Sequence, residues 1–313
     1  MTGMKSGVRE LVVAQGFADQ RIDNFLQREL RGVPRSYIYR ILRKGEVRVN
    51  KGRVKPVYRL QVGDVIRVPP MHTVARTSEV PGQTLLKNLS ERIILEDQYL
   101  IAINKPSGLA VHGGSGLKYG LIEGLRALRP ECPSLELVHR LDRATSGCLL
   151  IAKKRSVLSE LHTLLREKHI DKTYWALVQG KWPKKKVSIN VPLQKNTLKS
   201  GERLVSVNSK GKVALTEFRM LRKGHEASLV EAKPITGRTH QIRVHAQYAG
   251  HPIAGDDKYG EAGFDQQMKN HGLKRLFLHA HTIRFQLSMG AYTITAPLDD
   301  ALQRVLAQLG LTR

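Results

Sequence analysis

The chain has 313 residues, which is longer than one average domain and predicts two folded units, at least one large enough to enclose a reaction site. Its 52 lysines and arginines against 27 aspartates and glutamates give a formal charge of +25, far more than solubility requires. Such an excess indicates a polyanionic partner, and nucleic acid is the leading candidate. A membrane-surface protein is disfavoured, because the basic residues occur among turn and strand patterns and not along one amphipathic helix.

The chain contains two cysteines, Cys132 and Cys148, too few for a disulfide framework and not at a metal-ligand spacing. This predicts a reducing compartment, with the cytoplasm as the default. The first ten residues lack the apolar core of a signal peptide, and no run approaches the roughly 18 apolar residues of a membrane span. We therefore expect a soluble cytoplasmic protein with no membrane partner.

A small first unit is expected at residues 16–76, behind a flexible tail at residues 1–15. Apolar residues recur at helical spacing from Ile22 to Leu30, and a second helical pattern begins behind Ser36 as its cap and ends at Gly45. Two strand patterns follow, at Val47 to Val49 and at Val65 to Val68.

The first unit is strongly basic. Between residues 31 and 60, ten lysines and arginines are opposed by one acid, Glu46, which is the charge distribution typical of phosphate binding. A merely solvated charged face is the weaker interpretation, because unopposed cations repel one another without benefit. We expect RNA contacts from Arg35, Arg40, Arg43, Lys44 and Arg48.

A larger second unit is expected at residues 91–313, after a polar linker at 77–90. Because several of its strands follow one another without a crossover helix, the pattern predicts an α+β unit with a mixed, largely antiparallel central sheet. Apolar runs predict buried strands at Leu100–Ile103, Leu135–Val138, Cys148–Ala152, Tyr174–Val178 and Leu229–Ala232. Helical patterns lie at Leu121–Leu128, Val157–Leu165 and Thr239–Ala249.

A polar loop from Val138 to Gly147 lies between two of these strand patterns, where a rigid frame can present a reactive group to a substrate. Asp142 stands there between Arg140 and Arg143, whose charges would keep the carboxylate ionised as a nucleophile or base. A structural ion pair that fastens the loop explains the same spacing equally well. Spacing alone therefore leaves Asp142 either catalytic or structural.

Motifs in a fixed order separate these two interpretations. The segment His139–Gly147, HRLDRATSG, resembles the signature of the pseudouridine synthases that act on ribosomal and transfer RNA. Further segments resemble other motifs of that family, namely Asn104–Gly114, Lys172–Tyr174, Gly237–His245, His251–Asp256 and Leu276–Ala280. Residues 20–69 also resemble the RNA-binding module named after small-subunit ribosomal protein S4, so the resemblance covers nearly the whole chain.

The resemblance implies a role for each residue of the site. Asp142 would be the essential catalytic aspartate, Arg243 would pair with its carboxylate, and Tyr174 would pack on the target base. RNA contacts beside the site are expected from Arg140, which would fill the stack that the uridine leaves, and from Lys105 and Lys172 as supporting charges. The hydroxyl of Tyr174 is also a candidate general base, although its ordinary pKa near 10 weighs against it.

The implied reaction is isomerisation of uridine to pseudouridine in 23S ribosomal RNA, at several positions near the peptidyl transferase centre. The enzyme would flip the uridine out of its stack and act on naked RNA or on a large-subunit assembly intermediate. Asp142 has three possible first steps, namely attack on the anomeric carbon, attack on carbon 6 of the base, or removal of a sugar proton. We expect a monomer that needs no cofactor and no metal.

Three other functions remain as alternatives. A metal-dependent nuclease is disfavoured, because the spacings among His240, His245 and His251 do not place them on one helix face. A nucleoside hydrolase would use two carboxylates together, whereas Asp142 alone stands out. A ribosome-assembly factor without catalytic activity would need only the basic surface.

Overall fold

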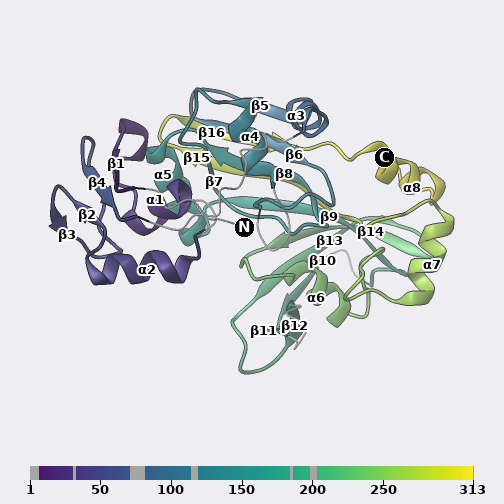
Figure 1. The fold of residues 1–313 in the computed structure, drawn as a ribbon. Helices are drawn as coiled ribbons and strands as arrows, with labels where there is room; N and C mark the ends of the chain where they lie inside the picture. The colour runs from purple at the N-terminus through teal and green to yellow at the C-terminus, as the bar shows by residue number, and fades with distance from the viewer. Residues whose placement is uncertain are drawn as a thin grey trace, which may run out of the picture.

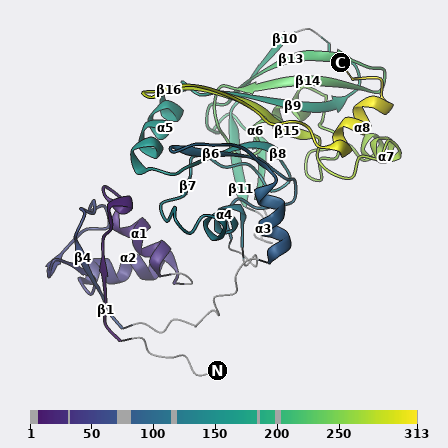
Figure 2. The same cartoon turned by 90° about the horizontal axis from the view of Figure 1, so that it is seen from above.

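The structure is a computed structural model that describes residues 7–30, 33–70, 82–113, 119–183, 186–197 and 203–312 (Figure 1). The described residues form a small amino-terminal unit, purple and dark blue in Figure 1, and a much larger second unit. Figure 2 shows the same separation from above, with the small unit beside the larger one. The two units touch where Arg28 donates a hydrogen bond to the carbonyl of Pro133.

A four-stranded sheet in the order β1-β4-β2-β3 and two helices form the first unit. Its elements are β1 (Arg9–Val12), the 3-10 helix Gln15–Phe17, α1 (Ile22–Glu29), α2 (Arg35–Lys44), β2 (Arg48–Val49), β3 (Gly52–Arg53) and β4 (Val65–Val68). Both predicted helices and both predicted strands are confirmed, and Gly45 ends α2 in the left-handed conformation at φ 69°. The predicted cap is wrong: Pro34, held at φ −59°, is the last extended residue, so Ser36 lies inside the first turn.

Two segments expected to be irregular are regular elements. Arg9–Val12, within the expected tail 1–15, pairs antiparallel with Val65–Val68 as β1. The helix α3 (Gln83–Ser90), within the expected linker 77–90, contributes buried Leu89 to the core of the second unit, while residues 77–81 lie outside the described residues. Both expectations were wrong for the same reason: these short segments are ordered by distant partners, which local periodicity does not reveal.

A ten-stranded sheet is the frame of the second unit, with the order β10-β13-β14-β9-β15-β8-β6-β5 and with β16 and β7 paired to β15 and β8. Its strands are β5 (Ile93–Glu96), β6 (Leu100–Lys105), β7 (Glu136–Leu137), β8 (Ser146–Ala152), β9 (Asp171–Gln179), β10 (Lys186–Asn190), β13 (Leu215–Lys223), β14 (Ala227–Pro234), β15 (Leu278–Leu287) and β16 (Gly290–Thr295). In the described chain the only parallel pair of this sheet joins β8 to β15. The predicted α+β unit with a mixed, largely antiparallel sheet is confirmed.

The remaining elements cover this sheet or extend from it. They are α4 (Leu121–Leu128), α5 (Arg155–Glu167), the hairpin of β11 (Leu193–Thr197) and β12 (Arg203–Val207), α6 (Gln241–Tyr248), α7 (Ala262–Asn270) and α8 (Asp300–Gln308). Figures 1 and 2 show α7 and α8 together at one end of the sheet, in light green and yellow.

Strand β6 explains why the central strands appear in the sequence as unbroken apolar runs. Leu100 and Ala102 pack in the cluster that includes α5, whereas Ile101 and Ile103 pack in the cluster that includes α3 and α4. Successive side chains point to opposite faces of a sheet, so a strand covered on both faces needs apolar residues at every position. Full burial of each large aliphatic side chain stabilises the fold by about 1.5–3 kcal/mol.

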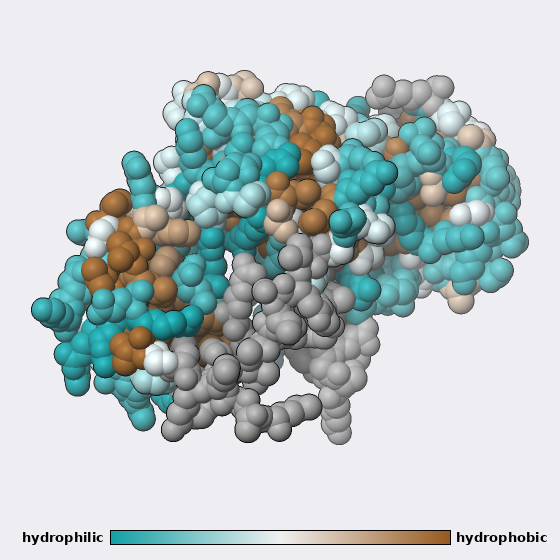
Figure 3. Space-filling model, turned by 45° about the horizontal axis from the view of Figure 1, so that its top comes forward, coloured by the Kyte–Doolittle hydropathy of each residue, from teal (hydrophilic) through white to brown (hydrophobic). Residues whose placement is uncertain are grey.

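The face of the molecule seen in Figure 3 is mostly hydrophilic, with scattered apolar patches in brown on both units. In the first unit, Val12 and Val62 are 68% and 59% exposed. None of the helices in the described ranges is both long and apolar enough to cross a membrane.

The junction of β8 with β15 requires a glycine. Gly147 has a φ of 109°, and a Cβ atom placed there would lie 2.3 Å from the carbonyl oxygen of Ala280. The pair of Gly147 with Ala280 directly follows the polar loop that carries Asp142. The close approach of these two backbones therefore fixes the end of that loop.

Gly147→Ala is expected to lower the free energy of unfolding by at least about 2 kcal/mol, because backbone strain adds to a clash with main-chain atoms. Urea denaturation measures this loss. Gly180→Ala is the matched control, since Gly180 also has a positive φ, 69°, but has nothing within 4 Å of an added Cβ. Equal losses in the two variants would show that the contact with Ala280 is unimportant.

Candidate active site

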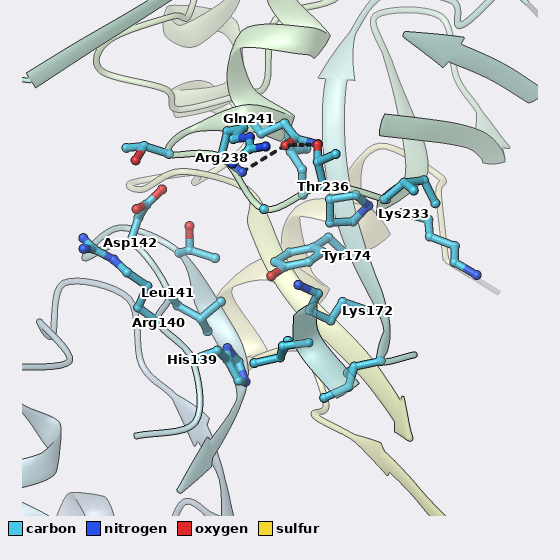
Figure 4. A pocket seen from close by; sticks show the side chains of 18 of the residues that line it. His139, Arg140, Leu141, Asp142, Lys172, Tyr174, Lys233, Thr236, Arg238 and Gln241 are labelled. Carbon is cyan, nitrogen blue, oxygen red and sulfur yellow. Dashed lines mark hydrogen bonds between the residues drawn. The ribbon is translucent and has the colours of Figure 1, made fainter. Parts of the chain in front are cut away.

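A pocket of about 550 Å³ opens between three segments that are distant in sequence (Figure 4). They are the loop 138–145 between β7 and β8, residues 165–174 from the end of α5 into β9, and the segment 233–243 that leads from β14 into α6. Among the expected site residues, Arg140, Asp142, Lys172, Tyr174 and Arg243 line it. A volume of this size suits a ligand as large as a nucleoside, since such sites typically enclose about 300–1,000 Å³.

The buried side chain of Lys105 holds the loop that carries Asp142 in place through hydrogen bonds. The ammonium nitrogen of this fully buried side chain donates hydrogen bonds to the carbonyls of Pro106, Leu109 and Arg143 at 2.9, 2.8 and 3.2 Å. Burial lowers the pKa of Lys105 to about 7, and the negative charge of Asp142 opposes that shift. The expectation that Lys105 contacts RNA is wrong, because the interior loop carbonyls occupy its three donors.

Asp142 faces the pocket from this loop, and its carboxylate is partly exposed, with 25% of the side chain accessible. The two flanking arginines do not hold it as expected: Arg140 is exposed, and Arg143 donates from Nε to the carbonyl of Gly108 at 2.9 Å. Among the described residues, the ion-pairing group nearest to it is His240, whose Nε2 lies 3.9 Å from Oδ2. Asp142 is therefore not locked in a structural salt bridge.

Arg243 is buried on α6 and forms its ion pairs with two other acids. Its guanidinium donates from Nε to Oδ2 of Asp256 at 2.7 Å and also bonds Oδ1, while Asp257 lies 3.0 Å from Nη2. Burial would lower the pKa of Arg243, but the contact with Asp256 outweighs it and raises the pKa, with a smaller contribution from Asp142. The expected direct pairing of Arg243 with Asp142 is thus replaced by attraction at longer range.

Tyr174 lies across the pocket from Asp142, on β9, and Figure 4 shows its ring facing the open space. Burial raises the pKa of its phenol above the ordinary value of 10, and the charge of Asp142 adds to the shift. The hydroxyl consequently stays protonated near neutrality, which argues against the general-base role expected for it. The aromatic face remains available to a flat ligand.

Two further side chains shape this end of the pocket. Lys172 lies beside Tyr174, and burial lowers the pKa of its ammonium, so its charge is poorly solvated until an anion approaches. Burial also lowers the pKa of His139 to about 3, and its neutral Nε2 accepts the backbone N–H of Leu150 at 3.3 Å. Burial therefore disfavours the charged form of both groups.

The segment before α6 is rigid because the side chain of one glutamine, Gln241, satisfies hydrogen-bonding groups of this segment. Oε1 of Gln241 accepts hydrogen bonds from the Thr236 hydroxyl and the Arg238 backbone N–H at 2.7 and 3.0 Å (Figure 4). Its Nε2 donates to the carbonyl of Leu215 and to the hydroxyl of Thr216, both at 2.9 Å. A buried amide with all four bonds made fixes its neighbours, here the upper wall of the pocket.

The basic residues expected to bind RNA in the first unit form a surface outside the pocket. Arg35, Arg40, Arg43, Lys44 and Arg48 are all exposed. Within the described residues these side chains contact tyrosine rings, a tyrosine hydroxyl and carbonyls: Arg40 lies 4.3 Å from the Tyr37 ring centre, and Arg43 bonds the carbonyl of Tyr39. These contacts do not neutralise the charges, which therefore remain available to an anion.

The three histidines of the metal hypothesis point to separate partners. His240 bonds Tyr259, His245 bonds Thr216, and His251 bonds the carbonyl of Gln179. In the described ranges, no three metal-binding side chains gather at one place.

Two residues of the site, Asp256 and Tyr259, were not predicted from the sequence. Asp256 ended a recognised motif, but only the folded chain shows that it receives Arg243. Tyr259, three residues later, bonds Nδ1 of His240 at 2.8 Å, and its pattern in the sequence gave no indication of this.

Comparison with known proteins gives consistent matches. A family model described as RNA pseudouridylate synthase matches residues 99–248, and one described as S4 domain matches residues 20–66. Proteins named ribosomal large subunit pseudouridine synthase C from Pasteurella multocida (strain Pm70) and Yersinia pestis are 54% and 56% identical, covering 98% and 96% of this chain and 95% and 96% of theirs. The structure titled human RNA pseudouridylate synthase domain containing 4 aligns with TM-score 0.62 and 26% identity, over 74% of this chain and 97% of that one.

Arg243→Met is expected to lower the free energy of unfolding by about 3–5 kcal/mol, because Asp256 stays buried without its cation. Adding Asp256→Asn should restore part of this loss, since no buried charge then remains and the amide oxygen still accepts backbone bonds. Denaturant titration of the single and double variants measures both effects. Arg219→Met, which breaks the exposed pair with Glu231, should cost below about 1 kcal/mol. If Asp256→Asn instead lowered the free energy of unfolding of Arg243→Met further, the two residues would not act as a buried pair.

Proposed function

Because this chain belongs to the RNA pseudouridine synthase family, we propose that it isomerises uridines of large-subunit ribosomal RNA to pseudouridine, with Asp142 as the catalytic carboxylate. The relatives named above support the choice of RNA, since their names specify the large ribosomal subunit. The observation that carries the proposal is the placement of an unlocked carboxylate opposite an aromatic face in a nucleoside-sized pocket.

In the proposed reaction, the flipped uracil lies against Tyr174 while Asp142 acts on the nucleotide. The bond from nitrogen 1 to the sugar breaks, the base turns, and carbon 5 joins the same sugar carbon, so no atom is gained or lost. A base that turns without leaving needs a flat apolar surface, which the ring of Tyr174 supplies. The three first steps open to Asp142 remain alternatives within this proposal.

Recognition of the RNA is proposed to involve both units. Arg140 is exposed on the catalytic loop, where a long planar cation could replace the flipped base in its stack. Lys172, poorly solvated at the pocket wall, would gain from an approaching phosphate or uracil oxygen. The exposed cations of α2 and β2 would bind backbone phosphates farther along the RNA. We propose a monomer that acts on 23S ribosomal RNA in the cytoplasm, without cofactor or metal.

Asp142→Asn should lower pseudouridine formation by about a thousandfold or more while RNA affinity stays near that of the parent, because the loop loses its ionised carboxylate and little else. The assay is pseudouridine mapping of large-subunit ribosomal RNA from cells with and without the gene, with the variant supplied in trans. Asp300→Asn, an exposed position on α8, is the matched control. Unchanged modification by Asp142→Asn would overturn the proposal, and free uracil as product would indicate a hydrolase instead.

Replacing both Arg40 and Arg43 with Gln should weaken RNA binding and reduce the slope of log affinity against log salt by about 1–2, since each phosphate contact contributes about 0.7–0.9. Binding titrations between low and moderate salt measure the slope. Arg219→Gln with Arg222→Gln removes the same charge from an exposed part of β13 and controls for net charge. Equal slope changes in the two double variants would count against a phosphate-binding role of α2.

A further inference from the structure

His240 occupies an unusual position at the beginning of α6. It precedes the helix as its N-cap with a φ of 52°, a left-handed conformation that a non-glycine residue adopts only when its surroundings impose it. The ring lines the pocket, and Nε2 is the imidazole atom on the side of Asp142, 3.9 Å from Oδ2. A strained backbone that turns a titratable ring toward the proposed catalytic carboxylate indicates a functional constraint.

Tyr259 determines which nitrogen of His240 carries the proton. Its buried hydroxyl accepts the backbone N–H of Val205 at 2.9 Å and lies 2.8 Å from Nδ1 of His240. A buried hydroxyl hydrogen needs an acceptor, and within the described ranges Nδ1 is the acceptor at hydrogen-bond distance. Tyr259 therefore donates to Nδ1, and the imidazole proton is on Nε2, the nitrogen that faces Asp142.

The position of Tyr259 is itself fixed by the Arg243 ion pair. Its backbone N–H donates to Oδ1 of Asp256 at 3.0 Å, and its ring lies under the guanidinium of Arg243 at 5.1 Å. The turn from Asp256 to Tyr259 thus orients the arginine with its carboxylate and the histidine with its phenol.

His240 is neutral in these surroundings, as a tautomer-dependent contact requires. Burial lowers the pKa of its imidazole below the ordinary 6.5, and Asp142 opposes the shift. The other charged groups that act on the ring are Arg243, Lys258 and Asp256.

We propose that His240 and Tyr259 are positioning residues for Asp142: Tyr259 fixes the tautomer of His240, and the resulting Nε2–H restrains the carboxylate when a nucleotide fills the pocket. This rests on the catalytic role proposed for Asp142. A separation of 3.9 Å is too long for a hydrogen bond, so the proposed restraint requires the carboxylate to move toward Nε2. Catalytic hydrogen bonds commonly shorten in this way when substrate binds.

Two amide variants of His240 separate this role from simple space filling. Gln places an amide nitrogen near the position of Nε2, whereas Asn reaches only the position of Nδ1. His240→Asn should lower the single-turnover rate of pseudouridine formation about 100-fold, with the RNA dissociation constant unchanged, because the carboxylate loses its orientation. His240→Gln should recover at least about tenfold of that loss. His225→Asn, on an exposed turn, controls for the substitution itself.

The tautomer can be measured directly, whether or not a variant is fully active. In protein with nitrogen-15 labelled histidine, the shifts of Nδ1 and Nε2 distinguish the tautomers, and the His240→Asn spectrum assigns the resonance. We expect the Nε2–H form in the parent at neutral pH. Tyr259→Phe should move the population away from that form and lower the rate about tenfold.

Equal rates for the Gln and Asn variants, a loss confined to RNA affinity, or an Nδ1–H tautomer in the parent would each overturn the proposal. Asp142→Asn, measured in parallel, distinguishes failure of the positioning role from failure of the proposed function. If it abolishes turnover while the His240 variants behave like the parent, only the positioning role fails. If it retains turnover, the proposed function fails first.

Discussion

The buried ion pair between Arg243 and Asp256 is the contact on which the pocket depends. Arg243 projects from α6 and Asp256 lies in the turn after it, so the pair joins helix to turn. The same carboxylate accepts the backbone N–H of Tyr259, and Tyr259 holds His240. Two charges buried this deeply are compatible with folding only together, because loss of either leaves the other unpaired in the interior. One pair thereby keeps the wall opposite the Asp142 loop in place.

The Asp142 loop is held by a buried cation of a different kind. Lys105 bonds carbonyls from two loops, so its ammonium fastens the Asp142 loop to residues 106–109. Gly147 then lets β8 approach β15 where that loop ends. Strand β9 carries Tyr174 between the two walls. Asp142 consequently has no close salt bridge, although the elements around it are held rigidly. A carboxylate that acts on a substrate needs this combination.

Prediction from the sequence succeeded where a residue's surroundings are set by its near neighbours or by burial on both faces. The runs in β6 and β8 predicted strands correctly because both faces are covered, and Gly45 predicted the end of α2 from its own backbone freedom. Strand β13 was not predicted, since Glu217 and Arg219 on its outer face leave no unbroken apolar run and a bulge between Met220 and Arg222 shifts the pattern. Helices α3 and α8 were missed as well, because their order depends on packing against distant segments.

By itself, the sequence determined the class of fold and the family, and it singled out Asp142 as the carboxylate for which we propose the catalytic role, because ordered motifs and apolar runs are local properties of the chain. Only the tertiary structure decided what each charged side chain touches. Lys105 and Arg243 are basic residues like the exposed ones of α2, yet one bonds interior carbonyls and the other a buried aspartate. A cation's role depends on the dielectric and the partners around it, and these are set by segments that meet only when the chain folds.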